Sequence, residues 1–424
     1  MSRGGESAHE TAEFVARASY GRLVAYLATR WRDVAGAEDA LADAFAAALE
    51  RWPRSGVPDK PESWLLTVAG RKLTDAARHA HIRQRPDVVA ALRKEEETSL
   101  HVPADFPDER IRLMLVCAHP AIHARVRPAL ILQTVLGLDA KGMAPAFLVS
   151  AETMTKRLVR AKAKIRDAGL RFEVPEPSEL AGRLHTLLEA IYAAYFLGRE
   201  GALSAGDGRD QLAAEAFYLA RVVASALPNN SEALGFLALL SFCEARRAAQ
   251  VDAAGDFVPL LEQDPATWDV ALMDEGYNVL DRAAVHNEIG PFQLEAAIQG
   301  AHCYRARSGQ TPWTEIASLY RALVSRYPTV GATVGLAVAT AHADEPSAGL
   351  AILETLDAHS VRSYQPYWVA MWHLHEMRGD RTKAHRFLLR ALGLTANPRL
   401  QRYLRSRLVR AESVAADPTD ERSP

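Results

Sequence analysis

A stretch of twelve residues, Ser150 to Ala161, combines the side chains that a protein uses to read double-stranded DNA. Helical spacing would turn one face inward, formed by Met154, Leu158, Ala161 and Ile165. The polar and basic residues are left outside, and they are Glu152, Thr153, Thr155, Lys156, Arg157, Arg160 and Lys164. A helix in the major groove needs this division, with polar residues for base edges and cations for phosphates. We therefore predict a DNA-recognition helix; the alternative is a charged face that is only solvated.

The residues before this helix predict its partner in a helix-turn-helix. The segment Leu138–Val149 would supply a first helix, with an apolar face made of Met143, Ala144 and Phe147, and then a tight turn at Leu148–Val149. Ser150 is a good N-cap for the second helix, because its hydroxyl can accept a hydrogen bond from a free backbone amide of the first turn.

The sequence carries no pattern typical of catalysis. A phosphate-binding glycine loop, an HExxH motif and a nucleophile elbow are all missing from it. His119 and His123 have the spacing of one helix face, but Pro120 lies between them and no third metal ligand is near. Asp252 and Asp256 bracket a segment that resembles a turn, since a calcium loop would need more oxygen ligands. We predict no catalytic residue, no metal and no cofactor.

Composition favours an all-α fold. Among the 424 residues alanine is abundant, and long alternating runs rich in Val, Ile and Thr are absent. The formal net charge is only −2, so cations matter where they gather, as they do at Arg71, Lys72, Arg78, Arg83 and Arg85. The three cysteines form no CxxC pair, the N-terminus has no secretory signal, and no apolar run is long enough to span a membrane. We predict a cytoplasmic protein with no membrane partner.

Proline, glycine and charged residues divide the chain into three blocks. We place a first domain at residues 10–85, a linker at 86–105, a second domain at 106–173 and a third domain at 179–412. The first domain would hold three helices, at Phe14–Thr29, Ala37–Trp52 and Glu62–His81. The second domain holds the helix-turn-helix.

The third block carries weak internal repeats. One set of residues lies at the offsets of a tetratricopeptide repeat, namely Trp368, Gly379, Ala384, Leu388, Ala391 and Leu392. Two further sets echo the second half of such a repeat, namely Ala216, Ala220 and Ala224, and Ala348, Ile352 and Leu356. We predict a solenoid of helical hairpins, and an irregular helical bundle is the alternative.

Several of these motifs, in this order, resemble one protein family. The segment Gly36–Trp52, GAEDALADAFAAALERW, resembles region two of bacterial RNA polymerase sigma factors of the extracytoplasmic-function type. Pro61–Arg78 looks like the continuation that handles the minus-ten promoter element, and the helix-turn-helix is similar to region four, which reads the minus-thirty-five element. Three further segments of this chain look like the subgroup of that family that has a fused tetratricopeptide-like domain. They are Cys117–Ala121, Phe147–Val149, and Val251–Asp256 followed by Trp268–Leu272.

The resemblance implies a polymerase contact on the Ala37–Trp52 helix. In the family this helix docks on the clamp helices of the largest subunit, and the flap is a second site on core polymerase. Carried over, the contact residues would be Asp39, Leu41, Asp43 and Phe45. An interface helix needs an apolar ridge with flanking charge, which these residues could supply. For Leu41 and Phe45 the alternative is a place in the core.

The resemblance also implies two DNA contacts. The minus-ten element would be held through phosphate by Arg71, Lys72, Arg78 and Arg83, after a base-capturing loop at Arg54–Lys60. Trp64 could stack on a base, but its helical spacing with Val68 favours a core role. The minus-thirty-five element would meet the recognition helix, with Arg160 and Lys164 on phosphate. The candidates for base edges are Glu152, Thr153, Lys156 and Arg157. Glu152 could accept from cytosine or only complement the helix dipole.

These implications predict a sigma factor that binds core RNA polymerase and promoter DNA, helps open the duplex and has no catalytic site. The third domain would regulate it in cis, through contact with the sigma modules, or add a polymerase contact. Two alternatives stay open. One is a helix-turn-helix regulator with a ligand- or peptide-binding helical domain, which would bind duplex DNA without polymerase. The other is an enzyme built on the third domain.

Overall fold

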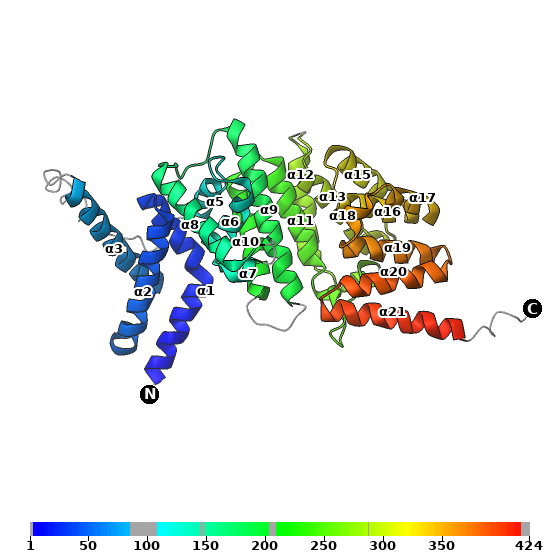
Figure 1. Cartoon of the computed structure of the whole chain (residues 1–424), viewed down its shortest axis with the longest axis horizontal. Coiled ribbons are helices and arrows are strands. Elements are labelled where there is room, and N and C mark those ends of the chain that lie inside the picture. The colour runs from blue at the N-terminus through cyan, green and yellow to red at the C-terminus, as the bar shows by residue number, and fades with distance from the viewer. Residues whose placement is uncertain are drawn as a thin grey trace, which may run out of the picture. The chain divides into compact units, whose positions relative to one another are not determined.

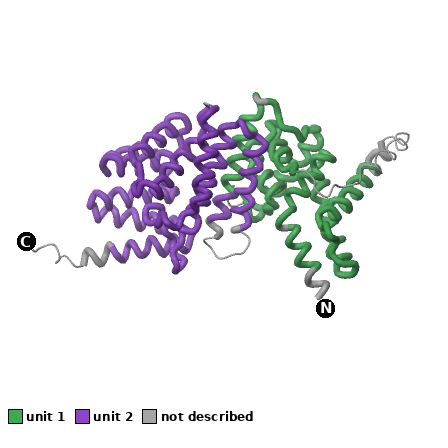
Figure 2. The backbone as a smooth tube through the Cα atoms, turned by 180° about the vertical axis from the view of Figure 1, so that it is seen from behind, with its two compact units in different colours: residues 1–194 green, residues 195–424 purple. Residues whose placement is uncertain are grey.

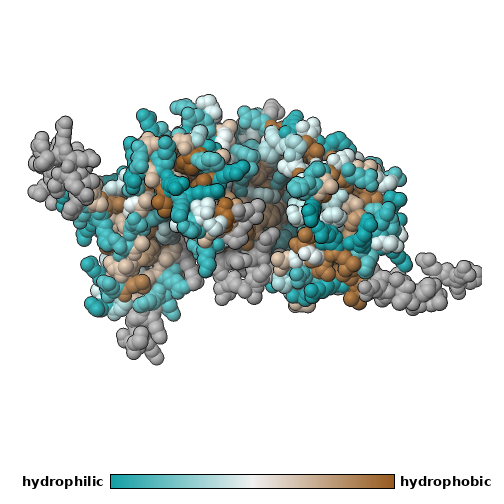
Figure 3. Space-filling model, viewed as in Figure 1, coloured by the Kyte–Doolittle hydropathy of each residue, from teal (hydrophilic) through white to brown (hydrophobic). Residues whose placement is uncertain are grey.

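The computed structural model describes residues 3–84, 108–144, 147, 149–202, 209–286 and 288–416. Over these residues the secondary structure is helical, apart from one isolated antiparallel bridge between Val251 and Phe257 (Figure 1). The all-α prediction is therefore confirmed. No helix in this part of the chain is both long enough and apolar enough to cross a membrane. Hydrophilic and hydrophobic residues are interspersed over the face drawn in Figure 3.

The chain forms two compact units, residues 1–194 and 195–424 (Figure 2). Both N-terminal blocks of the sequence analysis lie in unit 1, and the linker predicted at 86–105 lies outside the described residues. The helix α9 (Pro177–Ala202) contributes residues to each unit.

Unit 1 begins with three long helices, α1 (Arg3–Trp31), α2 (Val34–Ser55) and α3 (Pro61–Gln84). All three predicted helices of the first domain are present, and α1 starts earlier than expected. Their shared core is fully buried and includes Leu23, Leu27, Leu41, Leu65 and Leu66. Burying each such leucine stabilises the fold by about 2 kcal/mol, so this core is enough to orient α2 and α3.

The second part of unit 1 is a set of shorter helices. They are α5 (Arg110–Cys117), the 3₁₀ turn η2 (Ala124–Val126), α6 (Arg127–Leu136), α7 (Ala140–Met143) and α8 (Ala151–Asp167). The first helix of the helix-turn-helix, predicted to run up to the turn at Leu148–Val149, is much shorter in the structure. It ends at Met143, two residues before Pro145, which lacks the amide hydrogen that a continuing helix needs. Met143 and Ala144 are buried, and Phe147 is half-buried.

The two parts of unit 1 share a core. The helix α1 packs against α5 and α6, and α2 packs against α8. At Gly21 the backbones of α1 and α6 approach so closely that a Cβ atom would lie 1.9 Å from the carbonyl oxygen of Val135. The sequence predicts separate modules for the two parts of unit 1, because nothing in it pairs α1 with α6.

The contact at Gly21 gives a test of this packing. Gly21→Ala should lower the free energy of unfolding by about 3 kcal/mol, since a backbone carbonyl cannot move away as a side chain can. Gly182→Ala is the matched control, because no atom lies within 4 Å of its added Cβ on α9. The control should gain up to about 1 kcal/mol. Equal urea midpoints for Gly21→Ala and the wild type would contradict the packing of α1 on α6.

Unit 2 is a succession of helices that continues from α9. The first are α10 (Arg209–Ala226), α11 (Ser231–Ala245), α12 (Val270–Ala284), α13 (Pro291–Cys303), α14 (Arg305–Ser308) and α15 (Trp313–Arg326). The remainder are α16 (Val330–Ala343), α17 (Pro346–Glu354), α18 (Ala358–Val361), α19 (Gln365–Met377), α20 (Arg381–Leu394) and α21 (Pro398–Ala416). Three 3₁₀ turns lie between α11 and α12, namely η3 (Ala248–Gln250), η4 (Leu260–Glu262) and η5 (Pro265–Thr267).

These helices pack mainly on their neighbours in sequence, which is consistent with a helical solenoid. The clearest hairpin joins α19 to α20 through Gly379, whose φ of +77° suits glycine at a helix end. Ala384, Leu388 and Ala391 are buried inside it, as the repeat pattern predicted. In α17 the buried residues are Gly349, Leu350 and Leu353, so the core face is offset from the predicted Ala348, Ile352 and Leu356.

Candidate nucleic-acid interface

The helix α8 begins with the predicted cap. The Ser150 hydroxyl accepts a hydrogen bond from the Thr153 amide at 3.2 Å. This cap satisfies one of the free amides of the first helical turn and fixes where the helix begins.

The two faces of α8 differ as the spacing predicted. The inward face is buried and consists of Met154, Leu158, Ala161 and Ile165. Most of the candidate DNA contacts are exposed, namely Glu152, Thr153, Thr155, Lys156, Arg160 and Lys164, and Arg157 is half-buried. The helix therefore presents a polar first turn and a basic flank to solvent.

Two candidate base contacts are paired with each other. The Lys156 ammonium lies 2.6 Å from the Glu152 carboxylate, and both side chains are well exposed. An exposed pair of this kind contributes only about 0.3–0.5 kcal/mol. It can open without much loss when either residue meets a base edge.

A cavity of about 410 Å³ lies beside the basic flank of α8, and we call it the basic pocket. Its charged lining comes from Arg157, Arg160 and Lys164 of α8 and from Arg125 at η2, beside the ring of His123, and the lining residues that the structure describes include no Asp or Glu. The floor is apolar, made by Ala121, Ile122, Val126 and Ala161. Several cations around one small cavity form a site for an anion such as a backbone phosphate.

His123 and Arg125 were not predicted from the sequence as parts of this pocket. His123 was considered only as half of a metal pair with His119. In the structure the Nδ1 atoms of His119 and His123 accept hydrogen bonds from the amides of Ala121 and Arg125, at 3.0 and 3.3 Å. Both rings therefore shape the turn that carries Arg125. The only advance signal was the cluster of basic residues in HARVR, residues 123–127.

The exposed side of α2 differs from the predicted polymerase contact at one position. Asp39 and Asp43 are exposed and Phe45 is half-buried, but Leu41 is fully buried in the core of unit 1. The prediction of Leu41 as a contact residue is therefore wrong. Residues four apart on a helix are offset by about 40°, so the series from Leu41 through Phe45 turns outward. Its next member, Leu49, is 41% exposed and was not predicted.

A groove of about 420 Å³ between α2 and α3 brings two predicted sites together. The Lys72 ammonium, a minus-ten candidate, lies 2.6 Å from the carboxylate of Asp43, a polymerase candidate. Asp33 and Asp39 also line the groove. A phosphate at Lys72 would meet several carboxylates, so this groove favours a cationic partner.

The other minus-ten candidates lie further along α3. Arg71 is exposed, and Arg78 is half-buried with its guanidinium 3.5 Å from Asp75. The side chain of Arg83 lies outside the described residues. Trp64 is half-buried and packs edge-on against Trp52, with ring centroids 5.5 Å apart, which supports its place in the core.

A nearly buried ion pair joins the two parts of unit 1. The Lys162 ammonium of α8 lies 2.5 Å from the Glu38 carboxylate of α2, and the side chains are 10% and 17% exposed. Burial raises the pKa of Glu38, and the attraction of Lys162 offsets this only in part. Lys162 faces inward from α8 and thus neutralises the Glu38 carboxylate, which would otherwise be desolvated without a partner of opposite charge.

Removing the charge of Lys162 should make the free energy of unfolding depend on pH through Glu38. In Lys162→Met the pKa of Glu38 in the folded state rises further above its unfolded value, about 4.3. The folded state then binds more protons than the unfolded state, so stability falls as pH increases through that window. We expect a loss of about 3 kcal/mol at pH 8 and a smaller loss at pH 5, measured by urea denaturation.

The double variant Glu38→Gln/Lys162→Met is the control for this prediction. It removes both charges, so the pH-dependent part of the loss should disappear. A loss in Lys162→Met that is the same at both pH values would show that Glu38 is not the titrating group.

Comparisons with known protein families match two separate parts of the chain. The model of sigma-70 region 2 matches residues 16–82, which covers most of α1, α2 and α3. A family of unknown function (DUF6596) matches residues 183–284, from α9 to α12. No solved structure matches the chain.

The relatives differ in how much of the chain they match. An uncharacterized protein of Rhizobium meliloti is 33% identical over 407 residues, which cover 94% of this chain and 93% of the relative. The probable RNA polymerase sigma-C factor of Mycobacterium bovis and the ECF RNA polymerase sigma factor SigC of Mycobacterium tuberculosis are each 28% identical over 162 residues, 38% of this chain and 80% of the relative. The chain belongs to the family of the Rhizobium meliloti protein, and its sigma-70 region 2, together with its similarity to the two sigma factors, supports an RNA polymerase sigma factor.

Proposed function

We propose that this sigma factor recognises promoters through two DNA-binding surfaces of unit 1 and contacts core polymerase through α2. The observation that carries the proposal is α8, which exposes a capped polar first turn beside the basic pocket. In this proposal α7 and α8 act as a helix-turn-helix on the upstream element, with base edges met near Glu152 and Thr153. Arg157, Arg160 and Lys164 then face the phosphate backbone.

The polymerase contact would use the exposed side of α2. Asp39 and Asp43 supply negative charge, and Leu49 with the half-buried Phe45 supplies the apolar part. A partner with basic residues around an apolar patch would fit this surface, as the clamp helices of the polymerase would. The downstream element would meet α3 through Arg71 and Arg78. Polymerase performs the chemistry, so this chain would supply no catalytic residue.

Unit 2 would act on the sigma modules in cis or add a contact to polymerase. Its succession of helical hairpins supports an interaction domain, because such repeats present long surfaces to partners. The tetratricopeptide-like character of the repeats and the regulatory role are parts of this proposal. The protein would work in the cytoplasm, where core polymerase and promoter DNA are found.

The phosphate role of the basic pocket can be tested by Arg160→Ala. Losing one phosphate contact should weaken holoenzyme binding on all promoters alike, and the salt dependence of log K should flatten by about one. The measurement is fluorescence anisotropy on several promoter fragments over a salt series. Arg166→Ala is the matched control, since Arg166 is exposed on α8 but does not line the pocket. A loss confined to certain promoter sequences would show that Arg160 reads bases instead.

The division of labour between the units can be tested by truncation after Phe172, which keeps α1 to α8. Run-off transcription with core polymerase should still start at specific sites, at a level that differs from the full chain because unit 2 no longer acts. Circular dichroism would show whether the shortened chain keeps its helices. Unchanged transcription and unchanged polymerase affinity would remove the role of unit 2. Failure of the full chain to form holoenzyme would instead favour a regulator that binds duplex DNA without polymerase.

A further inference from the structure

The last two helices of unit 2 concentrate positive charge. Residues 381–410 contain eight arginines, one lysine and no Asp or Glu. The other 394 residues hold 41 of the 50 Lys and Arg and all 52 Asp and Glu. We call α20 together with this part of α21 the basic hairpin. Such a run repels itself, so it is stabilised by counterions or by an anionic partner.

The basic hairpin keeps its apolar side covered and its cations outside. Its buried residues are Ala384, Phe387, Leu388, Ala391, Leu404 and Leu408. Its exposed cations are Arg381, Lys383, Arg386, Arg390, Arg402, Arg405 and Arg410. The charge is therefore a surface feature of a packed hairpin, and the apolar side of α21 is not available to enter a lipid layer.

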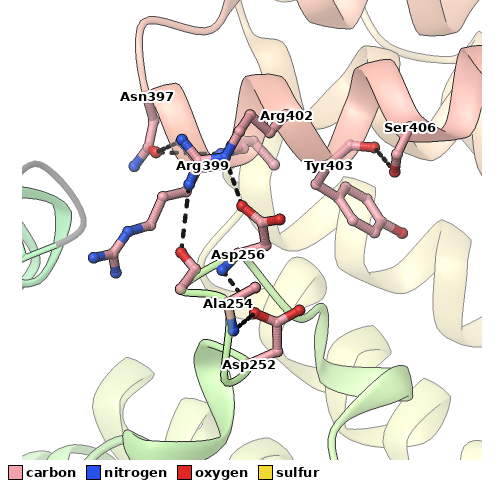
Figure 4. A network of polar contacts seen from close by, with 10 residues as sticks. Asp252, Ala254, Asp256, Asn397, Arg399, Arg402, Tyr403 and Ser406 are labelled. Carbon is pink, nitrogen blue, oxygen red and sulfur yellow. Dashed lines mark hydrogen bonds and ion pairs between the residues drawn. The ribbon is translucent and has the colours of Figure 1, made fainter.

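The loop between α11 and α12 is acidic where it meets α21, and it holds α21 in place (Figure 4). The Asp256 carboxylate lies 2.6 Å from Arg402, and Glu262 pairs with Arg407 and accepts a hydrogen bond from the Tyr403 hydroxyl at 3.1 Å. Asp252 is occupied within the loop, where its carboxylate accepts from the amides of Ala254 and Asp256. The loop thus neutralises two arginines and fixes the helix that also carries Arg399, Arg405 and Arg410.

The hairpin also forms a concave site with the end of α19. A cavity of about 340 Å³ is lined by the basic side chains of Arg381, His385, Arg407 and Arg410, over a floor that includes Trp372 and Leu388. Among the lining residues that the structure describes, Glu376 alone is acidic, and burial raises the pKa of its carboxyl. Cations from both helices of the hairpin therefore converge on one hollow, which a phosphate group could enter.

We propose that the basic hairpin binds the phosphate backbone of duplex DNA without reading its sequence. Arginine outnumbers lysine eight to one here, and the planar guanidinium donates two parallel hydrogen bonds to a phosphate. The choice of DNA over another polyanion rests on the proposed function, because a sigma factor is held beside promoter DNA. The hairpin would then add sequence-independent affinity to the two contacts of unit 1.

The test compares two triple variants of the full chain. Arg381→Gln/Arg405→Gln/Arg410→Gln removes three exposed cations of the hairpin. Arg282→Gln/Arg321→Gln/Arg326→Gln removes three exposed cations of α12 and α15 and is the matched control. The probe is a labelled 30-base-pair duplex without promoter elements, titrated by anisotropy over a salt series. Thermal melts establish that both variants fold like the wild type.

The hairpin variant should bind this duplex at least about tenfold more weakly at 0.1 M salt, and its salt slope should flatten by about two to three. The control should keep the wild-type slope. Equal slopes for the two variants would overturn the proposal. So would a hairpin variant that loses binding to polyglutamate or to phosphatidylglycerol vesicles while keeping its binding to DNA.

A parallel reconstitution with core polymerase separates this proposal from the proposed function. If the wild-type chain forms no holoenzyme, the sigma role fails, while the slopes on the duplex still decide whether the hairpin binds DNA. If holoenzyme forms and the two triple variants have equal salt slopes on the duplex, only the hairpin proposal fails.

Discussion

Unit 1 depends on one helix that must satisfy two environments. The inner side of α8 packs on α2, where the ion pair between Lys162 and Glu38 is nearly buried. A buried charge without a partner would destabilise the fold by several kcal/mol, so this pair fixes which side of α8 faces inward. The outer side is then left to solvent, with Arg160 and Lys164 beside the turn that carries Arg125. The buried ion pair orients α8, and the same packing leaves the basic flank of α8 exposed.

The same constraint organises the charges of α2 and α3. Glu38 points toward α8, while the neighbouring Asp39 and Asp43 line a groove with Lys72. One short acidic stretch therefore serves the core on one side and a surface on the other. Lys72 is paired there, whereas Arg71 on the same helix is exposed. In the function proposed above, the groove would meet a basic protein partner and Arg71 would meet DNA.

The helices of unit 2 also bury their apolar sides and expose charged residues. The loop between α11 and α12 reaches α21 across more than 140 residues of sequence, through Asp256 and Glu262. A solenoid otherwise has only local contacts, so these pairs give α21 a fixed place that neighbouring repeats alone would not provide. Surface pairs contribute little each, and their joint effect is to orient the helix rather than to stabilise the unit as a whole.

The sequence by itself determined the helical class, the cap at Ser150, the outward residues of α8 and the count of charges in residues 381–410. These follow from local propensity and the 3.6-residue period, which act within one helix. Only the tertiary structure decided that Leu41 is core while Leu49 is exposed, that Lys162 meets Glu38 and that His123 and Arg125 join the basic pocket. Periodicity shows that a helix has an inner face, but which distant residue covers that face depends on packing between segments more than one hundred residues apart.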